Sequence, residues 1–358
     1  MKYFPPDNVK KKVIFFTYHF PLPSESGSFR PWTEAKILSD LGFEVKVITS
    51  GRNYLSGKSL LKRGLFGKER VGNIEIFRFW SLPQYRKCPL TRLLGYFLYG
   101  VCAFWVAIFL PRPDKILVGT SSYFITYFFY FYRILKSRKI DFVVDERDLL
   151  VETAENLGII TNKAIIALLK KWDRFFRRKA TWVMTVNERM KKILIEKSGV
   201  SPGKIKVVYN VDIDLLHNGE LNLHSRDKFL EKEKFVVLYA GGMGMISDIP
   251  TILKAALLVK ENNPNVLFVL LGDGERRRHY DRFISRNRLS NVRIISAVSR
   301  QEARKYIASA DLCIHAVRNN EFWNVVLPSK IFDYLLLKKA VVFCGRGEVA
   351  SFLTRASA

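Results

Sequence analysis

The sequence has few of the residues that build disulfide frameworks and most metal sites. Among 358 residues there are four cysteines and five histidines. They are scattered at Cys88, Cys102, Cys313 and Cys344, and at His19, His217, His224, His279 and His315. Neither set shows the spacing of a metal site or of paired thiols, so we expect no bound metal and a reducing compartment.

Acidic residues are also scarce. The chain has 33 Asp and Glu against 59 Lys and Arg, for a formal net charge of +26. Such a balance is typical of proteins that bind nucleic acid, an anionic membrane surface or phosphorylated substrates. The charge is spread over many elements and no helix-turn-helix, zinc-finger or single-strand recognition motif is recognisable. Nucleic-acid binding is therefore kept as an alternative only.

No hydrophobic run is clearly long enough to span a membrane. The uncharged segment Leu93–Leu110 has 18 residues, which is the lower limit for a bilayer. Pro111 and Pro113 end it, and a core-like strand follows at once. We interpret it as a buried or interfacial helix. The first 20 residues also lack the pattern of a signal peptide, because the apolar run is short and no small-residue cleavage site follows.

Apolar strands alternate with helical segments along most of the chain. The order begins with strand 12–20, helix 31–43 and strand 44–50, and it restarts near residue 235 after a polar stretch. This alternation predicts an α/β protein with two doubly wound, Rossmann-like domains built on parallel sheets. We place the domains at 1–212 and 234–358, with a linker at 213–233.

Polar and glycine-rich loops follow several predicted strands of the second domain. Ligands bind beyond the carboxyl ends of parallel strands, so these loops are candidate site residues. They are Gly241, Gly242 and Gly244 in "AGGMG", Gly272, Asp273, Gly274 and Glu275 in "GDGE", and Ser329 and Lys330 in "VLPSKIFDYL". Glycines let a backbone approach a phosphate, and Lys330 adds charge at a helix start that we predict Ser329 to cap. Tight turns and an ordinary capped helix are the alternatives.

Several of these segments carry a family resemblance. They include "LSDLGFEVKVITS", "PRPDKILVGTSSY" and "VVDERDL" in the first domain. In the second they include "VLYAGGMG", "VLFVLLGDGE", "NVRIISAVSRQEARKYIASADLCI" and "LPSKIFDYLLLKKAVV". The chain resembles the retaining GT-B glycosyltransferases of glycosyltransferase family 4, in the branch that builds cell-surface polysaccharides and lipid-linked saccharides. The proline-serine-lysine before an acidic helix is the most specific of the matches.

The resemblance implies a GT-B fold, with two domains facing each other across a cleft, and a nucleotide-sugar donor, with a UDP-sugar favoured. The donor diphosphate would lie against Ser329 and Lys330, and Asp333 would hold the ribose hydroxyls. The remaining donor residues implied are Gly27, Gly241, Gly242, Gly244, Gly272, Asp273, Gly274 and Glu275. Arg147 and Asp148 would face a lipid-linked or polysaccharide acceptor, and we count both with Lys330 as catalytic. Such enzymes need no bound metal and no cofactor beyond the nucleotide-sugar substrate.

The sequence departs from the family pattern at several positions. Gly242 and Ser247 stand where an arginine and a lysine often contact the diphosphate. Val325 replaces the first glutamate of a paired motif, Arg147 replaces a histidine, and Lys338 replaces a glycine. The sequence stops at Ala358, where members of the family normally continue with further helices, so we also expect those helices to be missing. These departures keep open a non-catalytic GT-B-like scaffold.

Basic clusters flank the aromatic segments of the first domain. Between Arg52 and Arg92 there are ten basic and two acidic residues, and between Lys163 and Lys179 seven basic residues and one acidic. Basic side chains beside apolar helices favour docking on an anionic membrane surface. We therefore expect a cytoplasmic protein, peripheral at the inner face of the membrane.

Overall fold

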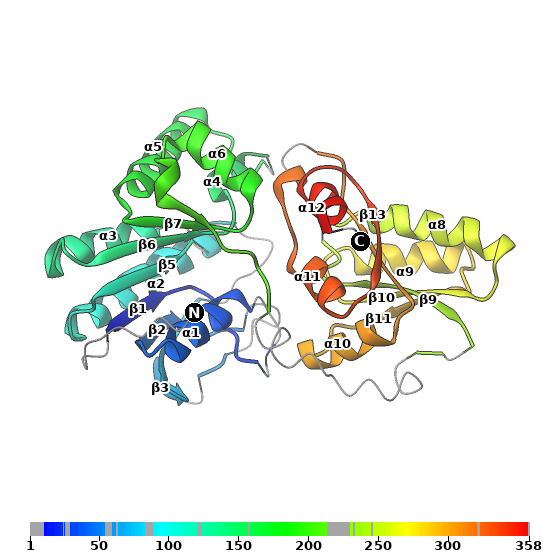
Figure 1. The fold of residues 1–358 in the computed structure, drawn as a ribbon, viewed down its shortest axis with the longest axis horizontal. Helices are drawn as coiled ribbons and strands as arrows, with labels where there is room; N and C mark the ends of the chain where they lie inside the picture. Colours follow the sequence, from blue (N-terminus) through cyan, green and yellow to red (C-terminus); the bar gives the residue numbers. More distant parts are fainter. Residues whose placement is uncertain are drawn as a thin grey trace. The chain divides into compact units, whose positions relative to one another are not determined.

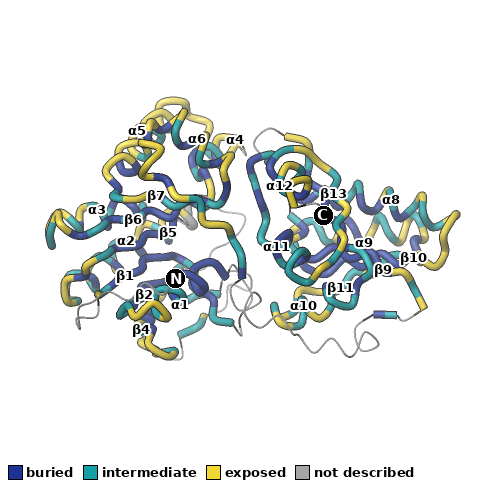
Figure 2. Tube along the Cα trace, viewed as in Figure 1, coloured by how far each residue is buried: buried dark blue, intermediate teal, exposed yellow. Residues whose placement is uncertain are grey.

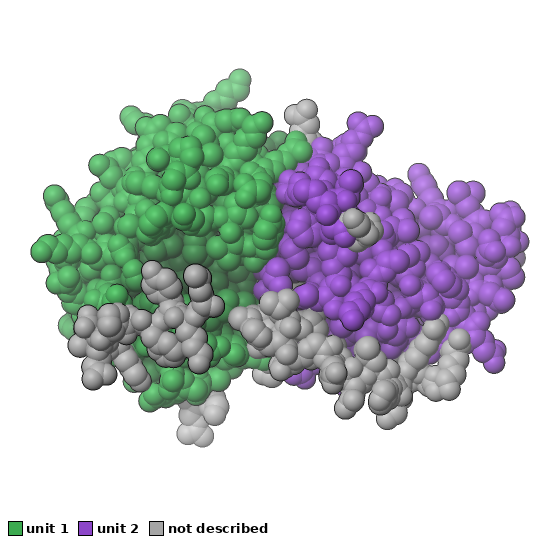
Figure 3. Space-filling model, viewed as in Figure 1, with its two compact units in different colours: residues 1–209 green, residues 210–358 purple. Residues whose placement is uncertain are grey.

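The computed structural model describes residues 11–23, 25, 29–53, 59–61, 64–82, 89–120, 124–156, 158–212, 230–231, 233–244, 246–320 and 323–356. The chain divides into two compact units, Met1–Tyr209 and Asn210–Ala358 (Figure 3). Most of the predicted linker, 213–233, and the candidate Gly27 lie outside the described residues.

The first unit is built on a sheet whose eight described strands are ordered β3-β4-β2-β1-β5-β6-β7-β8 (Figure 1). The strands are β1 Lys12–Phe16, β2 Glu44–Ser50, β3 Phe66–Val71, β4 Ile74–Phe79, β5 Lys115–Gly119, β6 Asp141–Glu146, β7 Trp182–Thr185 and β8 Ile205–Val207. β1 and β5 read as nearly continuous apolar runs because helices cover both faces of the sheet.

Six described α-helices belong to the first unit. They are α1 Arg30–Asp40, α2 Pro89–Phe109, α3 Ile125–Lys136, α4 Leu150–Asn156, α5 Lys163–Lys179 and α6 Glu188–Ser198. A short 3-10 helix, η1 Pro202–Lys204, precedes β8. On one face of the sheet, Trp32 and Ala35 of α1 pack on β1 and β2. α2 lies beside α3, and none of the described helices has the length and hydropathy that crossing a membrane requires.

One strand departs from the predicted parallel sheet. β3 pairs antiparallel with β4 at the edge of the first sheet, from Phe66↔Phe79 to Val71↔Ile74. The sequence analysis missed this strand because "FGKERV" carries three charged residues and none of its side chains is buried. An edge strand needs only one paired neighbour and no apolar face, so a charged sequence suffices there.

The second unit has a parallel sheet whose five described strands are ordered β11-β10-β9-β12-β13. They are β9 Phe235–Ala240, β10 Val266–Leu271, β11 Val292–Ile295, β12 Leu312–Ala316 and β13 Ala340–Cys344. Its described helices are α8 Ile249–Asn262, α9 Arg277–Arg286, α10 Arg300–Ser309, η3 Trp323–Val325, α11 Ser329–Leu336 and α12 Glu348–Ala356. The order of strands and helices follows the predicted alternation, while α4 and α12 were not predicted.

Alternate side chains of the second sheet form two hydrophobic layers. Val236 and Leu238 pack with α10, α11 and α12 on one face. Val237 and Tyr239 pack with α8 and α9 on the other. The strands β1, β5, β9 and β10 are buried along almost their whole length (Figure 2). The carboxyl ends of the strands are therefore held by a rigid core, and the loops after them are placed by it.

Candidate functional site

Two loops at the carboxyl edge of the second sheet pack backbone against backbone. Gly241 N–H donates to Leu271 O over 2.9 Å, and Met243 N–H donates to Asp273 O over 2.9 Å. A Cβ at Gly272 would lie 2.0 Å from Gly241 O, and one at Gly274 would lie 2.4 Å from Met243 O. Gly272 also has a φ of +145°. These two glycines are therefore required by the contact between the loops themselves.

Gly242 and Gly244 differ from them. A Cβ at either position would meet nothing within 4 Å, and neither has a positive φ. The described residues thus give no steric reason for glycine at these two positions. What the glycines do provide is backbone without a covering side chain, exposed at Gly242 and partly exposed at Gly244, in the loop after β9, where an open α/β sheet binds its ligand.

Lys330 lies over the start of this loop. Its Nζ donates to Tyr239 Oη at 2.9 Å and sits 4.1 Å from the centre of the same ring. A Cβ at Gly241 would lie 2.4 Å from Nζ, so the loop begins directly against the ammonium group. Within the described part of the chain, no carboxylate forms an ion pair with Lys330. Among the described residues the ammonium group therefore has no carboxylate partner, and its neighbours are Tyr239 and the backbone at Gly241.

The predicted cap of α11 is wrong by one residue. Pro328 occupies the N-cap position, with φ −69° and ψ 144°, and no side chain caps the helix. Ser329 is the first helical residue. Proline fixes an extended backbone before the helix and leaves the first turn without a competing side-chain acceptor. The first-turn amides of α11 and the positive end of its dipole lie at the same edge of the sheet as Lys330.

Asp333 is held by an arginine. Its Oδ1 accepts from Arg300 Nη2 at 2.9 Å, and Arg300 Nε lies 3.1 Å from Asp212 Oδ2. Burial raises the pKa of Asp333, and the charge of Arg300 opposes that effect. The carboxylate is thus fixed in position one turn inside α11, with the described ion pair using one of its two oxygens.

The "GDGE" residues form a braced turn. Asp273 accepts from Ala297 N–H at 2.8 Å and from Arg277 Nη1 at 2.6 Å. Desolvation acts to raise the pKa of Asp273, but these hydrogen bonds outweigh it and lower the pKa. Glu275 follows as an exposed side chain. Asp273 therefore serves to hold the loop that packs on Gly241 and Met243.

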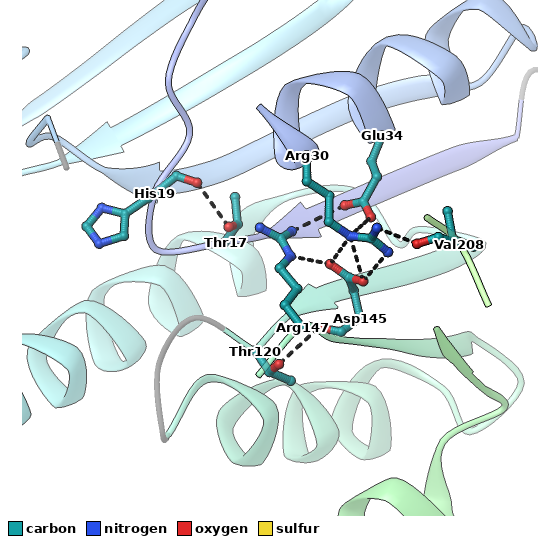
Figure 4. A network of polar contacts seen from close by, with 8 residues as sticks. All are labelled: Thr17, His19, Arg30, Glu34, Thr120, Asp145, Arg147 and Val208. Carbon is teal, nitrogen blue, oxygen red and sulfur yellow. Dashed lines mark hydrogen bonds and ion pairs between the residues drawn. The ribbon is translucent and has the colours of Figure 1, made fainter. Parts of the chain in front are cut away.

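In the first unit, Arg147 belongs to a buried network of charges (Figure 4). Asp145 lies between two guanidinium groups, 2.7 Å from Arg30 Nη2 and in an ion pair with Arg147 Nε. Glu34 completes the group, 2.9 Å from Arg30 Nε and 3.3 Å from Arg147 Nη2. Arg30 Nη1 also donates to Val208 O at 2.6 Å. Two cations and two carboxylates therefore balance.

The two carboxylates respond oppositely to this setting. Burial acts to raise the pKa of Asp145, but both guanidinium groups outweigh it and lower that pKa. The pKa of Glu34 is raised, first by burial and then by the charge of Asp145. A Cβ at Gly119 would lie 2.9 Å from Arg147 Nη2, so glycine at the end of β5 makes room for the arginine.

Arg147 therefore lies over the strand ends of the first sheet, and the adjacent Asp148 is exposed. The structure brings together Gly241, Gly242, Gly244, Gly272, Gly274 and Lys330 in the second unit, and Arg147 with Asp148 in the first. Within the described residues, no group of three His, Cys, Asp or Glu is placed to hold a metal ion.

Sequence analysis missed Tyr239, Arg30, Glu34 and Asp145. A signal existed for Tyr239, because a tyrosine inside the aliphatic strand "FVVLYA" needs a partner for its hydroxyl group once buried. Arg30 and Glu34 are four residues apart at the start of α1, which is the spacing of a helical ion pair. Their common partner Asp145 is 115 residues from Arg30, and no local pattern reveals it.

One family model and several solved structures are similar to this chain. Residues 234–355 match the family described as glycosyl transferases group 1. No significant match was found among curated protein sequences. The family match falls in the second unit, on the segment that holds the glycine loops and Lys330, and it supports a glycosyltransferase.

Solved structures of glycosyltransferases share the fold. WaaG, a glycosyltransferase involved in lipopolysaccharide biosynthesis, aligns with a TM-score of 0.63 at 14% identity, over 96% of this chain and 84% of WaaG. Anabaena HepE, in complex with UDP and glucose, aligns with a TM-score of 0.60 at 14% identity, over 96% and 83%. The trehalose 6-phosphate synthase of Burkholderia multivorans aligns with a TM-score of 0.65 at 13% identity, over 97% and 86%. The predicted GT-B fold, with two Rossmann-like units, is confirmed.

Proposed function

We propose that this protein is a retaining glycosyltransferase that moves a sugar from a nucleotide-diphosphate donor, with a UDP-sugar favoured, to a lipid-linked or polysaccharide acceptor. One observation carries the proposal: a lysine with no carboxylate partner among the described residues stands beside the glycine loop 241–244, in which Gly242 is exposed, inside the segment that matches glycosyl transferases group 1. The UDP complex of HepE, a protein of the same fold, supports the choice of donor.

The donor diphosphate would bind at this edge of the second sheet. Lys330 supplies a full positive charge, and the α11 N-terminus adds its partial charge and free amides. Gly242 and Gly244 allow phosphate oxygens to reach the backbone of the loop. Asp333, held by Arg300, would accept hydrogen bonds from the ribose hydroxyls.

The reaction breaks the bond between the anomeric carbon and the diphosphate oxygen. The acceptor hydroxyl oxygen forms the new bond from the same face, and its proton passes to the departing diphosphate oxygen, so configuration is retained. Charge that develops on the leaving group is stabilised by Lys330 and the amides, which is an electrostatic role. We propose that no metal and no covalent nucleophile take part, and that Arg147 and Asp148 contact the acceptor.

A membrane would deliver a lipid-linked acceptor to the first unit. Leu94, Leu98, Trp105 and Phe109 form one stripe along α2, and all are exposed, Phe109 by 81%. A second exposed stripe, Ile165, Leu168, Trp172 and Phe175, runs along α5. The helices that carry the stripes both pack on α3, since Phe97 of α2 packs against Phe128 and Phe175 of α5 packs against Tyr130. Exposed apolar side chains beside basic residues favour peripheral docking on an anionic leaflet.

Calorimetry tests the donor site first. We expect UDP to bind wild-type protein with micromolar affinity, equally with EDTA and with Mg²⁺, and more tightly than GDP. Lys330→Ala should weaken UDP binding at least tenfold without lowering the unfolding temperature. Lys254→Ala, an exposed lysine of α8, is the matched control and should bind like wild type. A folded wild-type protein that binds no nucleotide would contradict the proposed donor site.

Flotation with lipid vesicles tests the membrane step. Wild-type protein should float with vesicles rich in phosphatidylglycerol and remain behind with phosphatidylcholine alone. Trp105→Ser with Phe109→Ser should abolish flotation, while Leu258→Ser, which removes a 72% exposed leucine from α8, should not. Equal flotation of wild type and both variants would remove the apolar stripe of α2 from the proposal. Retention is tested separately. Proton NMR of the product reports whether the anomeric configuration of the transferred sugar is the same as in the donor.

A further inference from the structure

Tyr239 occupies an unusual position for a tyrosine. It lies in β9 among aliphatic residues and its exposed fraction is 0%. Its Oη nevertheless contacts three polar atoms. These are Lys330 Nζ at 2.9 Å, Ser247 Oγ at 2.8 Å and Gly242 O at 2.7 Å. One buried hydroxyl group therefore joins the lysine of α11 to both ends of the loop after β9.

The direction of these hydrogen bonds follows from the groups involved. An ammonium group has only donors and a backbone carbonyl only accepts. Tyr239 Oη must therefore accept from Lys330 and place its single proton toward Gly242 O or Ser247 Oγ. Ser247 Oγ also lies 3.0 Å from Gly242 O, to which it donates. The result is a linked set in which Gly242 O and Ser247 Oγ hold the phenol oxygen, and the phenol oxygen accepts from the lysine.

The ring itself acts on the same lysine. Nζ lies 4.1 Å from the ring centre, within the range of a cation–π interaction. The backbone at Gly241 closes the opposite side, because even a Cβ there would come within 2.4 Å of Nζ. A lysine side chain loses up to about 2 kcal/mol of conformational entropy when it is immobilised. Here that loss is incurred on folding, before a ligand arrives.

We propose that Tyr239 is a positioning residue, which holds the Lys330 ammonium group against residues 241–244 for the diphosphate of a nucleotide, with Ser247 as the second member of the link. The inference rests on the proposed function, since it names how the donor site presents its cation. The family resemblance leads us to expect cations at positions 242 and 247. Here Gly242 and Ser247 instead hydrogen-bond to Tyr239, which holds a cation that comes from α11.

Tyr239→Phe isolates the hydroxyl group, because the ring and its packing remain. We expect UDP and inorganic pyrophosphate to bind about three- to tenfold more weakly by calorimetry. Uridine, which has no phosphate, should bind as it does to wild type. A purely structural role for Tyr239 would weaken uridine and UDP together. Ser247→Ala should weaken UDP in the same way and by a smaller factor.

Tyr280→Phe is the matched control. Tyr280 is buried in the same hydrophobic layer as Tyr239, and its hydroxyl group has no hydrogen-bond partner in the described part of the chain. Removal of that hydroxyl group should leave UDP affinity unchanged.

A double-mutant cycle decides whether Tyr239 acts through Lys330. In a Lys330→Ala background, Tyr239→Phe should cause no further loss of UDP affinity. If wild type binds UDP and Lys330→Ala weakens it, but Tyr239→Phe binds like wild type, the positioning role is overturned and the donor site stands. Additive losses in the cycle also overturn it. If wild type binds neither UDP nor pyrophosphate, the proposed function fails, and the inference fails with it.

Discussion

Each unit places a cationic side chain near the carboxyl ends of its parallel strands, but the two cations are held in opposite ways. In the first unit, Arg147 and Arg30 are balanced by Asp145 and Glu34 in a buried group. In the second, Lys330 meets a phenol ring and a hydroxyl group instead of a carboxylate.

The difference separates two tasks that a charged residue can perform at a strand end. A cation paired with carboxylates fixes local geometry, and little of its charge is left for a ligand. A cation held by a neutral aromatic group is positioned equally well and keeps its charge. The arrangement of the second unit is therefore suited to an anion, and that of the first to a rigid framework.

The largest expected effect comes from Asp145→Asn, which removes the carboxylate shared by Arg30 and Arg147. Two buried guanidinium groups would lose compensation, at a cost of about 3–5 kcal/mol. Hydrogen exchange of β6 amides in increasing urea measures the loss within the first unit. Asp141→Asn removes an ion pair with Lys115 that is 36% exposed on both sides, and it should cost less than about 1 kcal/mol. Equal losses of stability in the two variants would mean that the buried network of charges around Asp145 is not a rigid framework for the first unit.

Gly272→Ala should destabilise the second unit by about 3 kcal/mol. The new Cβ would lie 2.0 Å from Gly241 O, and alanine would be strained at a φ of +145°. Urea unfolding followed by hydrogen exchange of β10 gives the value. A variant as stable as wild type would show that the two loops can separate at little cost.

Stability should also fall as pH rises from 5 to 8. Glu146 forms a bidentate pair with Arg177, yet burial raises its pKa to about 7 and outweighs the arginine. The unfolded carboxyl group has a pKa near 4.5. The folded state thus binds more protons between these values, and the free energy of unfolding decreases by about 2 kcal/mol across that range.

Urea midpoints measured from pH 5 to pH 8 test this slope. Glu146→Gln removes the titrating carboxyl group, while Arg177 keeps an ion pair with Asp173 at 3.5 Å, so the free energy of unfolding of the variant should depend less on pH. Glu75→Gln is the control: burial acts to raise the pKa of this carboxylate, but Lys68 and Lys46 outweigh it and lower the pKa, so the slope between pH 5 and pH 8 should persist. A slope unaltered by Glu146→Gln would assign the effect to another group.

Gly242→Ala should have the smallest effect on stability, within about 0.5 kcal/mol, because its Cβ would meet nothing within 4 Å. Its effect should appear instead in UDP affinity, as a loss of about tenfold, since the methyl group would stand where phosphate oxygens approach. Calorimetry of this variant beside Gly272→Ala distinguishes a glycine needed by the ligand from one needed by the fold. Unchanged UDP affinity would contradict that assignment.

The sequence was sufficient to predict the two-unit α/β architecture and the position of most strands. Buried parallel strands such as "VLFVLL" are continuous apolar runs, and "KVIFF" is preceded by lysines that mark its start. β3 was missed because three of its six residues are charged and none is buried. α12 was missed although Val349 and Leu353 on one face are buried. Local patterns thus identify strands with a buried face and miss a charged edge strand.

The candidate site was only partly predictable. Gly242, Gly244 and Lys330 were identified from loops that follow strands. The same rule grouped Gly272 and Gly274 with them, although contact between two loops 30 residues apart is what requires glycine there. Tyr239 lies 91 residues from Lys330 in the chain, so their contact is a product of the fold. Local sequence indicates which residue types gather at an edge, and tertiary packing decides which of them remain free to bind.

The edge strands of the first sheet affect how readily the protein aggregates while it folds. Parallel pairings such as β1 with β5 join segments about 100 residues apart, so they form slowly and expose strands in the meantime. One border of the sheet is β3, with charged residues on an antiparallel strand, and the other is β8, which is three residues long. A charged strand and a very short one are both poor templates for another chain. These two edge strands thereby limit aggregation, because the first sheet offers little edge with which a strand of another chain could pair.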